Sequence, residues 1–234
     1  MMIDTDLVKN KKFISPIESS ILKCSQEYRV LATLRYLYPS KYNTMIKGEA
    51  PDLQDREKST GIEVTSAVIK GDMKVARAFS ELKQGTPKDV ENRKKIESSG
   101  YSFVHLPNGM IAISSTGTDD GEKRVFSESI RKKADKLQQY QNNFMRIGLA
   151  ILLPEIPTSY TETHFSNWIS EIIDESENMF DFIYVISHRF CLYYDTQGNS
   201  VEKRSISKDE SCSLAKIARM TAEGELSMMD KEWH

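Results

Sequence analysis

An unbroken apolar run, from Ile147 to Leu153, constrains the fold more than any other stretch of this sequence. It contains no polar side chain and ends at Pro154. A strand with one face in water alternates apolar and polar residues, so a continuous apolar strand is typical of the buried centre of a sheet. Helical and strand-like segments alternate along the rest of the chain, and this alternation predicts a mixed α/β fold.

The clearest helix signal lies near the start of the chain. Ser15, Pro16 and Glu18 form a capping-box pattern with proline at the first helical position. Apolar residues then recur at steps of three and four until Pro39 ends the pattern. We therefore expect a helix over residues 16–38.

The remaining elements follow from periodicity and turn residues. Further helices are expected from residue 72, over 122–145 and over 162–176, while the charged segment 88–98 and the last 30 residues have weaker helical patterns. The expected strands are 42–46, 50–55, 61–68, an Asn-Gly hairpin within 101–113, 147–153, 182–186 and 189–194.

Two acidic residues lie on neighbouring predicted strands. Asp52 follows Pro51 at the start of one strand, and Glu63 lies between two apolar residues inside the next. A carboxylate in an apolar strand is costly to bury unless it is paired or bound to a metal. Two such carboxylates can bind one hard cation such as Mg²⁺. The alternative is that Asp52 is a turn residue and Glu63 faces water, which strand alternation also allows.

This segment resembles the motif of the PD-(D/E)XK nuclease superfamily, in which Pro-Asp and a short spacer precede an apolar strand carrying Glu-x-Lys. Pro51-Asp52 matches the first part, and Glu63-Val64-Thr65 matches the second with Thr65 in place of the lysine. The resemblance covers residues 16–153. It implies a restriction-endonuclease-like αβββαβ core with a mixed central sheet and a C-terminal α/β extension. We therefore expect a nuclease-like core at 1–153 and an extension at 154–234, packed on the core or continuous with it.

The resemblance also implies an activity, which is hydrolysis of DNA phosphodiester bonds by a metal-dependent nuclease using Mg²⁺, or Mn²⁺ in its place. Asp52 and Glu63 would hold the metal, with the Val64 carbonyl as a candidate for a further ligand. Several family members complete the metal site with a glutamate of the first helix. Glu27 is the candidate for that role here, and a solvated helix carboxylate is the alternative.

The missing lysine has a candidate on the helix expected at 122–145, since some family members carry it on the following helix. One step of the apolar stripe on this helix is unfilled, and Lys133 lies there. A lysine on such a stripe either extends to solvent or reaches a carboxylate. We expect Lys133 to hold the attacking water or to stabilise charge on the phosphorane. The alternatives are that Lys133 extends to solvent or that Lys70, which lies past the strand, takes the role. The stripe consists of Phe126, Ile130, Leu137, Tyr140 and Phe144.

The net charge of -2 conceals an uneven distribution. Residues 1–146 carry a net charge of +6, and residues 147–234 carry -8. The first part can therefore attract a polyanion such as DNA. Arg131, Lys132 and Lys136 are the candidates for contacts with the phosphate backbone. The acidic part would face away from DNA or bind a partner, and a homodimer is a further option.

Several other classes of protein receive no support from the sequence. The three cysteines and four histidines are scattered and form no zinc pattern. The chain has no phosphate-binding glycine motif, no run of 18 apolar residues and no apolar leader segment. We therefore expect a cytoplasmic protein that does not contact membranes.

Two other interpretations remain open. The first is a non-catalytic module on the same fold that binds nucleic acid or protein, for example a phage or defence-system subunit. Thr65 favours this interpretation because the motif lysine is absent. The second is an unrelated α/β protein with an accidental match. A separation of more than about 10 Å between Asp52 and Glu63 would favour the second, because no single cation could then contact both.

Overall fold

The computed structural model describes residues 11, 13, 17–67, 74–75, 77–79, 81–82, 87–105, 111–115, 120–137, 140, 143–153, 162–175 and 179–227. These residues form two compact units. The first contains residues 1–66 and 129–234, and the second contains residues 67–128. The second unit is therefore an insertion in the sequence of the first.

A mixed seven-stranded sheet organises the first unit, and its strand order is β1-β2-β3-β6-β7-β8-β9. The three central strands, β3, β6 and β7, run parallel, and the flanking strands pair antiparallel. The strands are β1 (Ile46–Lys47), β2 (Leu53–Asp55), β3 (Thr60–Ser66), β6 (Arg146–Leu152), β7 (Phe182–Ile186), β8 (Phe190–Asp195) and β9 (Ser200–Ser205).

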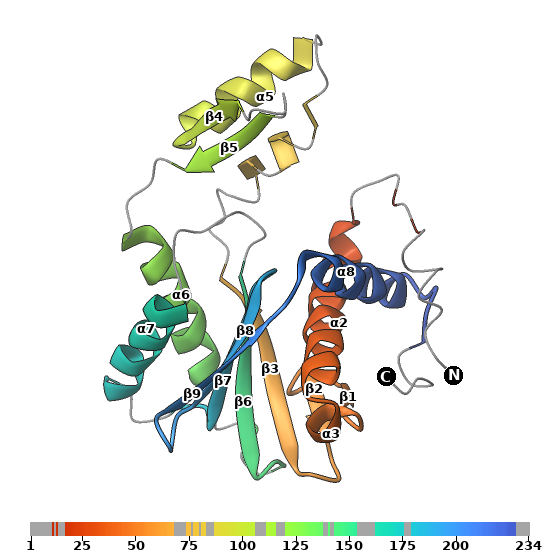
Figure 1. Ribbon diagram of the computed structural model, residues 1–234, viewed down its shortest axis with the longest axis vertical. Coiled ribbons are helices and arrows are strands. Elements are labelled where there is room, and N and C mark those ends of the chain that lie inside the picture. The colour runs from red at the N-terminus through yellow and green to blue at the C-terminus, as the bar shows by residue number, and fades with distance from the viewer. Residues whose placement is uncertain are drawn as a thin grey trace. The chain divides into compact units, whose positions relative to one another are not determined.

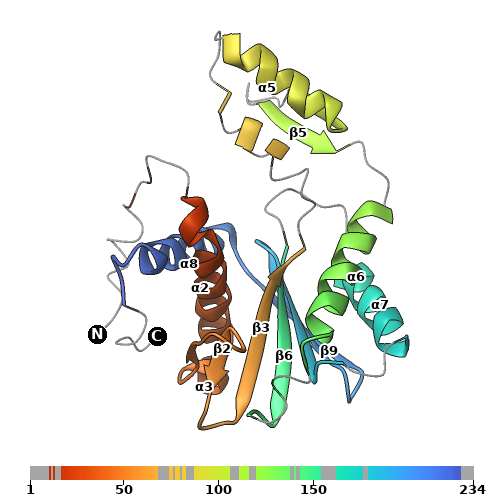
Figure 2. The same ribbon diagram turned by 180° about the vertical axis from the view of Figure 1, so that it is seen from behind.

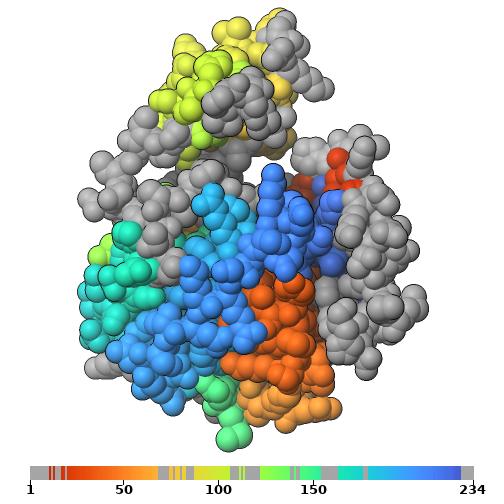
Figure 3. Space-filling view, in the orientation of Figure 1, coloured from red at the N-terminus to blue at the C-terminus, as the bar shows by residue number. Residues whose placement is uncertain are grey.

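Helices lie on both faces of this sheet (Figures 1 and 2). On one face, α2 (Ser19–Leu37) packs against α8 (Lys208–Ala222), and the short α3 (Pro39–Tyr42) follows α2. On the other face lie α7 (Glu162–Asp174) and the end of α6 (Asp120–Ala134), which begins in the second unit. Residues from both ends of the described chain thus meet on one surface, where α2 and α8 adjoin (Figure 3).

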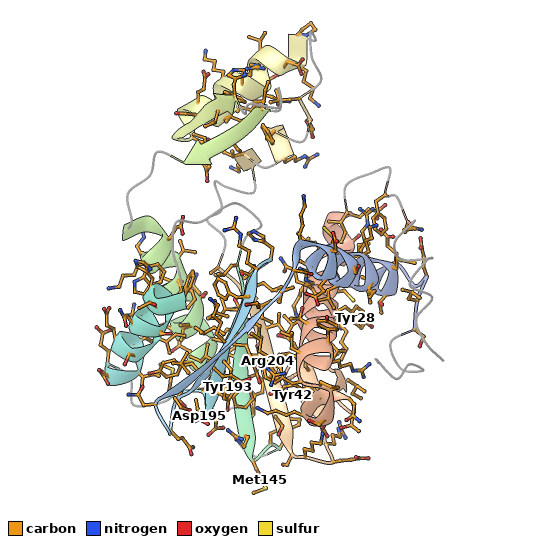
Figure 4. The ribbon with its side chains drawn as sticks, viewed as in Figure 1. Tyr28, Tyr42, Met145, Tyr193, Asp195 and Arg204 are labelled. Carbon is orange, nitrogen blue, oxygen red and sulfur yellow. The ribbon has the colours of Figure 1, made fainter. Side chains whose placement is uncertain are left out.

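The core of the first unit includes an aromatic cluster between α3 and the sheet. Phe182, Tyr184 and Tyr193 line this side of β7 and β8, and the Lys41 ammonium lies 4.5 Å from the ring centroid of Tyr193 and 5.2 Å from that of Tyr42. Figure 4 shows Tyr42 and Tyr193 in this region. Burial raises the pKa values of Tyr42 and Tyr184, whose hydroxyls share a hydrogen bond of 2.9 Å.

The second unit combines a helix with a two-stranded sheet. It contains α5 (Pro87–Ser98), β4 (Tyr101–His105) and β5 (Ile111–Ser115), and the two strands pair antiparallel. Its core includes Val75, Ile96 and Tyr101. In the described residues of either unit, no helix has a stretch long and apolar enough to cross a membrane.

The structure confirms the α/β class and the central position of the apolar strand, which is β6. Several expected boundaries are wrong. Residues 17 and 18 are not helical, and α2 begins at Ser19 with Glu18 as its N-cap, without a side-chain cap. The helix expected to reach residue 145 ends at Ala134. The strand expected at 42–46 is reduced to Ile46–Lys47, because Tyr42 belongs to a helical turn.

Two further comparisons concern the C-terminal part. A strand at residues 200–205 was not expected, where β9 forms the edge of the sheet with every residue exposed. Its one apolar residue, Val201, is too little for an alternating pattern that would reveal an edge strand. The expected boundary at residue 153 falls between β6 and α7, inside the first unit, and β7 continues the same sheet. The expected start of the first helix at Ser15 and Pro16, the helix start at residue 72, and Lys70 lie outside the described residues.

Gly148 provides a test of the packing in the sheet centre. An added Cβ would lie 2.0 Å from a ring carbon of Phe182 on the adjacent strand. Gly148→Ala should therefore lower the free energy of unfolding by about 1–3 kcal/mol in urea denaturation, because the core is overpacked. Gly198→Ala is the matched control, since its nearest neighbouring atom would lie at 3.6 Å. Equal stability of the two variants would contradict this packing.

Candidate functional site

Asp52 lies immediately before the first residue of β2. Of the residues of β3, only Thr60–Ile62 pair with β2, so among the described residues β3 continues past Asp52 without a partner strand on that side. Pro51 has no N–H and cannot extend the ladder. Asp52 Oδ2 instead accepts a hydrogen bond of 2.8 Å from the Val64 N–H. The carboxylate is therefore fixed by the backbone, and only 5% of its side chain is exposed.

Glu63 lies on β3 and contacts Lys133 in the last turn of α6. The Lys133 Nζ lies 2.5 Å from Glu63 Oε2 and 3.4 Å from Asp52 Oδ2. Tyr140 also forms a hydrogen bond with Glu63. One ammonium thus contacts both carboxylates, which places them within reach of a single cation and well inside the limit of about 10 Å for a shared ion.

Two further lysines extend this arrangement. The Lys23 Nζ lies 3.3 Å from Asp52 Oδ1 and 3.2 Å from Glu27 Oε1. The Lys47 Nζ lies 3.0 Å from Glu27 Oε2. Cations and carboxylates therefore alternate through a continuous set of contacts, which we call the ion chain. Its members, in order, are Lys47, Glu27, Lys23, Asp52, Lys133 and Glu63.

The surroundings of the ion chain shift the pKa values of two of its members and of Tyr140 beside it. Burial alone would raise the pKa of Asp52, but the Val64 N–H and the charges of Lys133 and Lys23 outweigh it and hold this pKa below its usual value. Hydrogen bonding to Glu27 and the charge of Asp52 raise the pKa of Lys23. Burial, together with the charge and hydrogen bond of Glu63, raises the pKa of Tyr140 to about 12. Asp52 is therefore ionised and Tyr140 is a neutral donor at neutral pH.

The structure brings together four residues that the sequence singled out, since Glu27, Asp52, Glu63 and Lys133 all belong to the ion chain. Val64 contributes its N–H to Asp52. The N–H and C=O of one strand residue face the same neighbouring strand. The Val64 carbonyl therefore remains a candidate ligand on that side.

The three residues expected to contact DNA lie outside the ion chain. Lys132 and Lys136 are exposed, and Lys136 follows the end of α6. Arg131 is also exposed and forms an ion pair of 2.6 Å with Glu175, which offsets its charge.

Three residues of the site were missed in the sequence. Lys23 lies four residues before Glu27 on the same helix, and this spacing was a usable signal. Lys47 comes from a two-residue edge strand and has no local pattern that points to Glu27. Tyr140 was assigned to the apolar stripe, and it is buried, but its hydroxyl contacts Glu63.

The chemistry of the donors fits a hard divalent cation. Mg²⁺ in enzymes is bound by one or two carboxylates, with water and substrate phosphates as its other ligands. Asp52 and Glu63 supply two carboxylates, and the Lys133 ammonium between them shows that this position accepts positive charge. Within the described ranges, no group of three or more His, Cys, Asp and Glu side chains is placed to hold a metal. Any cation here would therefore depend on water and substrate for its remaining ligands.

Comparisons with protein-family models, with curated proteins and with solved structures found no match to this chain.

The contribution of Lys133 to folding can be measured directly. Among the described residues, Lys133→Met would leave Glu63 with no cation and Asp52 with one fewer, and unfolding in urea should show a loss of about 3–5 kcal/mol. Arg131→Met is the matched control two residues earlier. Its ion pair with Glu175 is exposed on both sides, so the loss should be below about 1 kcal/mol. Similar losses in the two variants would contradict a buried role for Lys133.

The lowered pKa of Asp52 predicts a specific dependence of stability on acid. The ionised Asp52 stabilises the fold fully above its ordinary pKa of 3.8, and this contribution disappears as the pH falls through the lower pKa of the folded state. The free energy of unfolding of Asp52→Asn should therefore fall less steeply with acid than that of the wild type below about pH 4. Parallel acid profiles would show that Asp52 is not held as described.

Proposed function

We propose that this chain is a metal-dependent nuclease that hydrolyses DNA phosphodiester bonds, with a site resembling that of the PD-(D/E)XK superfamily. The observation that carries the proposal is the contact of the Lys133 ammonium with both Asp52 and Glu63. A lysine of α6 thus reaches the two motif carboxylates although Thr65 replaces the motif lysine. Apart from the short α3 between α2 and β1, and the insertion of residues 67–128, the order α2, β1, β2, β3, α6, β6 is also compatible with the αβββαβ core that the resemblance implies.

In this mechanism, the side chains of the protein bind the cation, orient the attacking water and stabilise the charge that develops on the phosphate. Asp52 and Glu63 hold the cation, with the Val64 carbonyl and Glu27 as candidates to complete the site. When bound, Mg²⁺ neutralises charge on the phosphate and lowers the pKa of its water. Lys133 positions the attacking water or stabilises charge that develops on the phosphorane. The exposed Lys132 and Lys136 contribute contacts with the DNA backbone.

A second candidate is a non-catalytic module that binds nucleic acid or protein. The observation that favours it is the complete set of lysine contacts in the ion chain, since each of its three carboxylates already has a cation partner. Such a cluster is stable without a metal. The two candidates differ in whether Asp52 and Glu63 serve chemistry or only folding.

A cleavage assay distinguishes the two candidates. The wild type should cut closed circular, linear or single-stranded DNA with Mg²⁺ and not with chelator. Asp52→Asn and Glu63→Gln should reduce the cleavage rate by at least about 100-fold, because each removes charge that holds the cation. Lys133→Met should reduce it by about 100- to 1,000-fold. Lys95→Met, which removes an exposed lysine paired with Glu91, is the control for the loss of one charge.

Two results would contradict the nuclease proposal. Cleavage that persists in both Asp52→Asn and Glu63→Gln would show that the activity comes from elsewhere. No cleavage of any DNA form by a folded protein that still binds DNA would favour the non-catalytic module.

A further inference from the structure

Lys23 is the most exposed cation of the ion chain. Its side chain is 75% exposed, whereas those of Lys47 and Lys133 are 30% and 19% exposed. An exposed ammonium can leave its partners more readily than a buried one, because water solvates it, but the two buried carboxylates that it leaves then need another cation. Of the three lysines, Lys23 is therefore the one that can most readily be exchanged.

Lys23 contacts one oxygen of Asp52 and one of Glu27, and the other oxygen of each carboxylate contacts a different partner. Asp52 Oδ2 is committed to the Val64 N–H and to Lys133, while Oδ1 contacts Lys23. Glu27 Oε2 contacts Lys47, while Oε1 contacts Lys23. Lys23 thus holds one oxygen from each of two buried carboxylates, and these two oxygens would be released together if its ammonium moved away.

We propose that Lys23 is an exchangeable counter-ion, which a divalent cation displaces from Asp52 Oδ1 and Glu27 Oε1 and which then binds a phosphate of the substrate. This inference rests on the proposed function, because the cation is the one that the function requires, held by Asp52 with Glu27 in its candidate role of completing the site. The buried carboxylate oxygens stay compensated during the exchange, because one cation replaces another beside them. An ammonium on a flexible stem is also a suitable ligand for phosphate.

The first test measures the binding of Mn²⁺ alone to the full chain, by calorimetry or by its electron paramagnetic resonance. If Lys23 competes with the cation, Lys23→Met should bind Mn²⁺ about tenfold more tightly than the wild type, because a unit charge close to the ion has been removed. Lys23→Gln should behave alike. Lys95→Met is the matched control, an exposed lysine with a helical glutamate four residues away, and its affinity should equal that of the wild type.

The outcomes separate this inference from the proposed function. Mn²⁺ binding that is lost in Asp52→Asn but not tightened by Lys23→Met would overturn the inference and leave the nuclease proposal standing. No binding of Mn²⁺ to the wild type or to Lys23→Met would overturn both. Circular dichroism of each variant would establish that the fold is intact.

The second test examines the released ammonium. Binding of a fluorescent DNA duplex should be measured with Ca²⁺ and again with chelator. Lys23→Met should weaken binding several-fold with Ca²⁺, because a phosphate contact is lost, and should have no effect with chelator, when Lys23 is held by its carboxylates. An equal loss under both conditions would show that Lys23 contacts DNA without exchange and would overturn the inference, and absence of DNA binding in both would do the same.

Discussion

The cost of burying three carboxylates in one region is the constraint on which the rest of the first unit depends. Glu27, Asp52 and Glu63 are each at most 3% exposed. A buried carboxylate without a partner costs several kcal/mol, and a well-placed ammonium offsets most of that cost. The necessary lysines come from a helix on each face of the sheet and from its edge strand. Packing of both helical layers is therefore coupled to the compensation of charge.

The position of the site follows from the unequal lengths of the strands. β2 is three residues long and β3 is seven, so the second half of β3 has no partner strand on one side. Asp52 supplies the acceptor that the sheet lacks there. Lys23 from α2 and Lys133 from α6, which lie on opposite faces of the sheet, both contact Asp52 there. The Asp52 carboxylate thus both satisfies the Val64 N–H and is a candidate ligand for the cation.

The sequence identified most of the residues of the ion chain but not the elements that bring them together. Asp52 and Glu63 were identifiable because a proline and an apolar strand mark their places, and Lys133 because it interrupts an apolar stripe. The stripe was nevertheless assigned to one long helix, whereas α6 ends at Ala134 and Tyr140 lies beyond it. Helix periodicity cannot show where tertiary contacts end a helix. Lys47 could not be predicted, because it lies on a two-residue edge strand whose sequence has no pattern that points to Glu27.

The insertion of residues 67–128 has a consequence for how such a protein can diversify. This segment lies in the sequence between the strand that carries Glu63 and the part of α6 that carries Lys133, yet every member of the ion chain belongs to the first unit. Its strands pair with each other, in a sheet separate from the one that carries Glu63. Closing a longer or shorter loop changes the folding free energy only slowly with length. The segment between β3 and the end of α6 is therefore a site where one inserted unit can be replaced by another without changing any residue of the ion chain.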